Sequence, residues 1–193
     1  MINLKKNDEA LVVPEQNGPK HLGIGLGWDP EQTSGVPCDL DASAFMLGAD
    51  GQIVDEPFFV FYNNPTSPDG AVMSTGDDRT GDSSAGGDDE TLFVDVTLVD
   101  PRVQQIIFVV TIHEAKARRQ SFGQVHNSFI RVYDQDTNEE IARYNLEDSF
   151  STETGIQAGR LYRDGNTWHF EALGYGVQGG LEELLGIYAD KFC

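Results

Sequence analysis

Residues 21–29 read HLGIGLGWD, a stretch that alternates large apolar side chains with glycine. The large residues are Leu22, Ile24, Leu26 and Trp28. Because successive side chains of an extended chain point to opposite faces, this period of two predicts a strand with one apolar face. The opposite face carries only glycines, which indicates that another part of the protein packs closely against it.

Similar patterns recur on both sides of this stretch, separated by turn signals such as Asp50-Gly51 and Asp164-Gly165. Further strands are predicted at residues 11–13, 39–49, 57–62, 91–99, 104–113, 128–134, 139–145, 160–163 and 166–173. Residues 114–123 are predicted to contain a short helix. The sequence therefore predicts a mainly β protein, a β-sandwich of two sheets with short helices.

The C-terminal tail LEELLGIYADKF, residues 181–192, has a different period. Leu181, Leu184, Leu185 and Tyr188 are spaced three and four residues apart, which places them on one face of a helix. We therefore expect the sandwich to include a C-terminal amphipathic helix.

Length and charge narrow the class of protein. The 193 residues fit a single domain, which we expect to span residues 1–193. A formal net charge of −19 argues against direct binding to nucleic acid and favours cations or basic partners. No apolar run of about 18 residues is present, so no transmembrane segment is predicted. The N-terminal apolar run ALVV is too short for a signal peptide, so an intracellular protein is expected.

Acidic residues gather at three places. The segment TGDDRTGDSSAGGDDE, residues 75–90, holds six acidic residues and one basic residue, Arg79. Asp29 follows the opening strand, and Asp39 and Asp41 lie two apart, so their side chains point the same way in an extended chain. In a sandwich, loops at one end gather in space, and the three places are expected to converge.

Several carboxylates brought close together repel one another and raise each other's pKa, whereas a hard cation between them reverses that cost. Calcium takes about 6–8 oxygen ligands in irregular geometry, which suits acidic loops rich in glycine and serine. A zinc site is not favoured, because Cys38 is the only Cys or His beside the acids. The competing interpretation is a solvated acidic loop without a ligand.

Two other motifs resemble known sites only in part. Residues 134–138 begin like an EF-hand loop, but the glycine and the final glutamate of that loop are replaced by Glu139 and Asn145, so a hairpin turn is predicted. Residues 174–179 match GxGxxG without a βαβ unit and are predicted to form a turn before the terminal helix. The four histidines are predicted to be structural or exposed.

A set of segments, in order along the whole chain, resembles the TerD family of tellurite-resistance and stress proteins. These segments are GLGWD (25–29), DLDASAF (39–45), FVFYNN (59–64), SPDGAV (67–72), TGDDRTG (75–81), GDDE (87–90), IFVVTIHEAKARRQSFGQV (107–125), SFIRV (128–132), EEIARYNL (139–146) and STETG (151–155). The resemblance implies a calcium-binding β-sandwich of the bacterial cytoplasm without established catalysis.

The resemblance also implies ligands and partners. Carried over by motif, the metal ligands are Asp29, Asp39, Asp41, Asp77, Asp88, Asp89 and Glu90. Asp78 stands where the family usually has Asn, and we include it among the candidate metal ligands. Two calcium ions are expected. The implied partners are other proteins of the tellurite-resistance or stress operon, in membrane-associated assemblies. The alternative function is a metal-dependent, hydrolase-like enzyme that uses the same acidic site.

Overall fold

A computed structural model describes residues 1–30, 38–75, 87–146 and 150–192. Its strands form two six-stranded sheets. The first sheet has the order β1 (Ile2–Leu4), β10 (Glu140–Asn145), β9 (Val125–Asp134), β3 (His21–Pro30), β7 (Glu90–Asp95) and β6 (Val72–Ser74). The second sheet has the order β2 (Glu9–Val13), β12 (Thr167–Val177), β11 (Gly155–Asp164), β8 (Gln105–Ile112), β4 (Leu40–Leu47) and β5 (Phe59–Val60).

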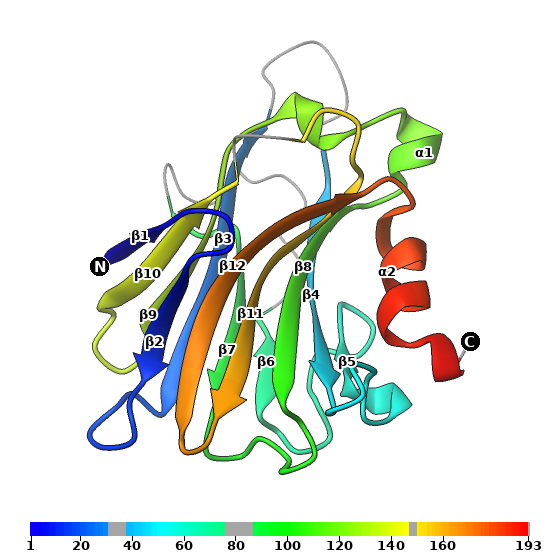
Figure 1. The fold of residues 1–193 in the computed structure, drawn as a ribbon. Helices are drawn as coiled ribbons and strands as arrows, with labels where there is room; N and C mark the ends of the chain where they lie inside the picture. The colour runs from blue at the N-terminus through cyan, green and yellow to red at the C-terminus, as the bar shows by residue number, and fades with distance from the viewer. Residues whose placement is uncertain (31–37, 76–86, 147–149, 193) are drawn as a thin grey trace.

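The two sheets face each other across the main hydrophobic core, as Figure 1 shows. All of their hydrogen-bonded strand pairs are antiparallel except β1 with β10. The apolar face of β3 points into this core, where Leu22, Ile24 and Leu26 are at most 1% exposed. Phe108 and Phe170 of the second sheet are fully buried in the same core. The predicted β-sandwich is therefore confirmed.

The glycine face of β3 is covered by its neighbour β9. Gly23 lies opposite Tyr133 and Gly27 lies opposite Phe129. A Cβ atom at Gly23 would be 2.1 Å from the Tyr133 ring, and one at Gly27 would be 2.4 Å from the Phe129 ring. Both distances are far below a van der Waals contact, so the rings occupy space that only glycine leaves open. This packing is the close approach that the alternating sequence predicts.

A second, smaller core lies on the outer face of the second sheet, beneath helix α2 (Gly180–Tyr188). Leu184 is fully buried there, and Leu181 and Leu185 pack against it in part. The amphipathic C-terminal helix is therefore confirmed. Tyr188 donates a hydrogen bond from its hydroxyl to Gln157 Oε1 at 2.5 Å, and its burial raises its pKa to about 12.

Three predicted elements are shorter than expected, and two strands were missed. The strand predicted over 57–62 forms only at β5, because the 3₁₀ helix η1 (Glu56–Phe58) precedes it. The strand predicted over 91–99 ends at Asp95. The short helix predicted within 114–123 is a single turn, α1 (Ala115–Arg118), followed by the 3₁₀ helix η2 (Phe122–Gln124). Another 3₁₀ helix, η3 (Asp190–Phe192), follows α2. The missed strands, β1 and β6, have three residues each.

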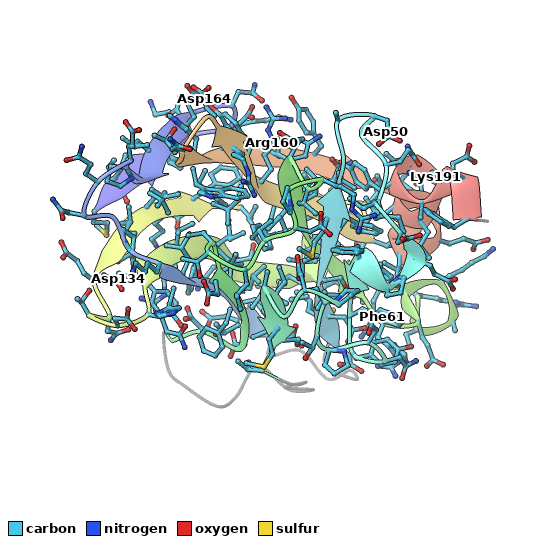
Figure 2. The ribbon with its side chains drawn as sticks, turned by 90° about the horizontal axis from the view of Figure 1, so that it is seen from below. Asp50, Phe61, Asp134, Arg160, Asp164 and Lys191 are labelled. Carbon is cyan, nitrogen blue, oxygen red and sulfur yellow. The ribbon has the colours of Figure 1, made fainter. Side chains whose placement is uncertain are left out.

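The two ends of the sandwich are formed by different segments of the chain. Helix α1 and the start of β4, which carries Asp41, lie at the upper end in Figure 1; we call this end the acidic end. The turns at Asp50, Asp134 and Asp164 lie at the lower end, seen in Figure 2 from below. Within the described ranges, no helix is long and apolar enough to cross a membrane.

Candidate metal centre

The acidic motif DDE at residues 88–90 connects three strands. Asp89 Oδ2 accepts a hydrogen bond from the backbone N–H of Trp28 on β3, at 2.8 Å. Glu90 Oε2 accepts one from the backbone N–H of Ala42 on β4, at 2.5 Å. The two carboxylates are almost buried, with residue exposures of 8% and 5%. Because β4 belongs to the second sheet and β7 to the first, Glu90 joins the two sheets at this end.

These contacts bring together the described parts of the three acidic places of the sequence. Trp28 immediately precedes Asp29, and Ala42 immediately follows Asp41. The motifs WD, DLD and DDE are therefore neighbours in space, as predicted, through hydrogen bonds from backbone to side chain.

Asp88 points to the outer face of the first sheet. Arg131 on β9 donates to it at two points, with Nε–Oδ1 and Nη2–Oδ2 distances of 2.7 and 2.9 Å. The hydrogen bond to Asp88 raises the pKa of the Arg131 guanidinium further. Gly25 makes room for the pair, because a Cβ there would lie 2.2 Å from Asp88 Oδ2.

Asp39 and Asp41 each lie beside a basic side chain. Asp39 Oδ2 is 3.6 Å from Nη1 of Arg118, on α1. Asp41 Oδ2 is 3.5 Å from Nδ1 of His113, which follows β8. The two aspartate side chains are 16% exposed. The other oxygen of Asp39, Oδ1, is buried and has no hydrogen-bond partner among the described residues.

A groove of about 890 Å³ opens beside Asp41, between α1 and the start of α2. Its lining includes His113, Lys116, Gln178 and Glu182. The groove therefore gives solvent and solutes access to one side of the Asp41–His113 pair.

The remaining candidate ligands are more scattered. Asp29 Oδ2 accepts a short hydrogen bond from Asn127 Nδ2. Asp77 and Asp78 lie outside the described residues. Within the described part of the chain, no three or more His, Cys, Asp or Glu side chains are grouped so that they could hold a metal ion. The structure thus brings the motifs together without gathering their carboxylates into one cluster.

Asp39 nevertheless carries one oxygen to which a hard cation could bind. A buried carboxylate oxygen without a hydrogen bond is costly, because burial removes its water and nothing in the described structure replaces it. A cation bound at Oδ1 would remove that cost. The donors at Asp39 and Asp41 are carboxylate oxygens, the type that calcium prefers.

Three basic residues at these acids were missed by sequence reasoning. Arg118 and His113 reach Asp39 and Asp41 because β8 pairs with β4 and the chain then turns into α1. Arg131 reaches Asp88 across β3. The run IHEAKARR contains two of the three, but only the pairing of β4 with β8 shows which acids they face.

Comparison with known proteins places this architecture in a family. The family described as "TerD domain" matches residues 1–188. The chain belongs to the TerD family. It is 46% identical to "Tellurium resistance protein TerD" of Serratia marcescens over 187 residues, which cover 97% of this chain and 96% of that protein. It is 42% identical to "General stress protein 16U" of Bacillus subtilis over 188 residues, covering 97% and 96%.

A solved structure of the TerD family supports the fold independently. The crystal structure of a homologue of telluride resistance protein (TerD) from Streptomyces coelicolor A3(2) superposes with a TM-score of 0.70. The match covers 88% of this chain and 96% of that one, at 23% sequence identity. At this identity, the likeness shows the shared fold alone. Together, the relatives are named for tellurium resistance and for stress response.

Proposed function

We propose that this TerD-family chain is a calcium-dependent, non-catalytic interaction module of a bacterial stress response, acting in the cytoplasm. Calcium would bind at the acidic end of the sandwich, with Asp39 and Asp41 as its anchoring ligands. The candidate ligand set could coordinate two ions. Its other members are Asp29, Asp77, Asp78, Asp88, Asp89 and Glu90. Other proteins of the same resistance or stress system would be the partners.

The observation that carries this proposal is the buried Oδ1 atom of Asp39. It is a carboxylate oxygen withdrawn from solvent, with no hydrogen-bond donor among the described residues, and a second acid, Asp41, follows two positions along the chain. Glu90 and Asp89 hold the neighbouring strands in place through backbone hydrogen bonds, so the pair lies on a fixed scaffold. The formal charge of −19 further raises the local concentration of cations.

Isothermal titration calorimetry tests the proposal. Protein stripped with a chelator is titrated with calcium, with magnesium present as background, and the titration is repeated with Asp39→Asn plus Asp41→Asn. The wild type is expected to bind about two calcium ions, and the double variant is expected to lose at least one of them. A wild type that releases no heat and shows no uptake in equilibrium dialysis would refute the proposal.

A matched control separates site chemistry from bulk charge. Glu56→Gln plus Glu139→Gln removes the same charge from two exposed residues, in η1 and in the turn between β9 and β10. This variant is expected to bind calcium with the wild-type stoichiometry. If it loses calcium to the same extent as the aspartate variant, calcium is attracted by overall charge and not by a site.

One observation favours the alternative, a metal-dependent hydrolase. His113 lies 3.5 Å from Asp41 at the edge of a groove of about 890 Å³, where a base could act on a water molecule beside a bound cation. Hydrolysis of p-nitrophenyl phosphate, measured with calcium, magnesium and manganese, distinguishes the two functions. The interaction module predicts no turnover, whereas the enzyme predicts metal-dependent turnover that His113→Ala abolishes.

A further inference from the structure

The Arg118 guanidinium lies between the candidate calcium ligand Asp39 and a second acid, Glu114. Its Nη1 atom is 3.6 Å from Asp39 Oδ2, while its Nη2 atom is 3.2 Å from Glu114 Oε2, one helical turn earlier. The guanidinium thus bridges Asp39, which precedes β4, and Glu114, which precedes α1. Its side chain is 28% exposed, so it can move into solvent without breaking the core.

The turn that carries Arg118 is held at both ends. Glu114 and Arg119 flank the single turn of α1, and both have left-handed backbone conformations, with φ of 51° and 55°. Ala115 is buried beneath the turn. The backbone therefore fixes where the Arg118 side chain begins, and only its flexible end decides whether it contacts Asp39.

We propose that Arg118 is a built-in competitor for the cation at Asp39 and that it sets the calcium concentration at which the site fills. The inference rests on the proposed calcium site. The guanidinium neutralises Asp39 through Oδ2 when calcium is absent. A calcium ion bound to the same carboxylate through Oδ1 places a second positive charge within a few ångströms, and the two repel each other. Filling the site therefore requires the guanidinium to leave Asp39.

Removing the competitor makes calcium bind more tightly. Because Asp39 and Arg118 are both partly buried, their interaction is screened less than that of fully exposed charges. Arg118→Gln is expected to lower the Kd for calcium about tenfold, which corresponds to about 1.4 kcal/mol. Arg118→Lys keeps the positive charge and is expected to stay within about threefold of the wild type.

Lys116→Gln is the matched control, since it removes one positive charge from an exposed position of the same turn. It measures how much any lost positive charge increases calcium affinity. Calorimetry on the three variants and the wild type then has distinct outcomes. Arg118→Gln binding several-fold more tightly than Lys116→Gln supports the inference. Equal affinities for these two variants, weaker binding by Arg118→Gln, or an Arg118→Lys variant as tight as Arg118→Gln would overturn it.

A measurement on the unmodified protein covers the case in which a variant does not fold. NMR follows the exchange of the Arg118 Nη1–H protons with water as calcium is added, because Nη1 is the atom beside Asp39, whereas Nε donates to Glu114 Oε2. Release from Asp39 is expected to accelerate that exchange. Arg160 of β11, whose Nε lies 2.5 Å from Glu171 Oε2 of β12, serves as the internal control. Calcium-dependent shifts elsewhere with an unchanged Arg118 would overturn the competitor role alone. No calcium-dependent shift at any residue would instead refute the calcium site itself.

Discussion

The Arg131 guanidinium holds the Asp88 carboxylate at two points, through contacts of 2.7 and 2.9 Å across the bare backbone of Gly25. The pair links β9 to the start of β7 and fixes one side of the acidic motif. Its side chains are 22% and 9% exposed, so it is largely shielded from water.

Replacing Arg131 is expected to destabilise the protein. Arg131→Gln removes both charged hydrogen bonds to Asp88, and we expect the free energy of unfolding to fall by about 2 kcal/mol. Urea denaturation in the presence of EDTA measures the change. Lys116→Gln, at an exposed position, should change stability by less than about 0.5 kcal/mol. Equal stability of the two variants would mean that the ion pair contributes nothing.

The glycine face of β3 gives a second prediction. Gly23→Ala places a methyl group 2.1 Å from the Tyr133 ring, which must shift, and we expect a loss of about 1–3 kcal/mol. Gly186→Ala is the contrasting substitution, because a Cβ there meets no atom within 4 Å. Gly186 lies in α2, where alanine should stabilise the helix by up to about 1 kcal/mol. Chemical denaturation should therefore show opposite signs for the two variants.

For β3, the sequence predicts the two faces of the strand but not the residues that cover them. The alternation of Leu22, Ile24 and Leu26 with glycine predicts a strand with a buried face and a closely packed one, and both exist. The sequence does not show that Tyr133 and Phe129 cover the glycines, because that depends on pairing with a strand about a hundred residues away.

Local rules also explain the elements that differ. In PFFVFY, Pro57 has no N–H to donate and a fixed φ, so the chain begins with the 3₁₀ turn of η1 before it enters β5. The helix predicted after β8 is limited to one turn because Glu114 and Arg119 adopt left-handed conformations on either side. The left-handed conformations of Glu114 and Arg119 leave no signal in the hydrophobic periodicity, so the sequence does not predict where this helix ends.

The sequence also predicts one part of the candidate metal centre and not another. The convergence of the motifs around Asp29, Asp41 and Glu90 follows from the rule that loops at one end of a sandwich gather, and hydrogen bonds to their strands confirm it. The basic partners of Asp39 and Asp41 could not be predicted, since they depend on the register between β4 and β8.

A pH-dependent contribution to stability is expected at His21. Its ring Nδ1 lies 2.9 Å from Asp136 Oδ2, and this hydrogen bond raises the His21 pKa above its usual value of 6.5. Because the folded pKa is the higher one, the stabilisation is fully present below about pH 6.5 and is lost as the pH rises through the raised pKa. The melting temperature of the wild type minus that of His21→Gln should therefore fall as the pH rises above about 6.5.

The salt dependence of the same difference provides the control. The side chains of His21 and Asp136 are 43% and 63% exposed, so added salt should reduce the difference in melting temperature at pH 6. A difference that is constant across pH would show that the contact with Asp136 does not depend on the charge of His21.

Tyr188 tests the packing of α2 onto the second sheet. Tyr188→Phe removes the hydrogen bond to Gln157 and leaves the ring in place against Phe45, 5.2 Å between centroids. We expect a loss of about 1 kcal/mol, measured by urea denaturation. A variant as stable as the wild type would indicate that water replaces the lost hydroxyl.

If a hard cation binds the acidic end of the sandwich, it must stabilise the folded chain. Thermal unfolding of one protein sample, in EDTA and then in excess calcium, tests it most directly. At a free calcium concentration one hundred times the Kd, linkage adds about 2.7 kcal/mol, which corresponds to a rise in melting temperature of about 5–10 °C for a chain of this size. We expect that rise for the wild type and a smaller one for Asp39→Asn plus Asp41→Asn. A melting temperature unchanged by calcium and by chelator would contradict it.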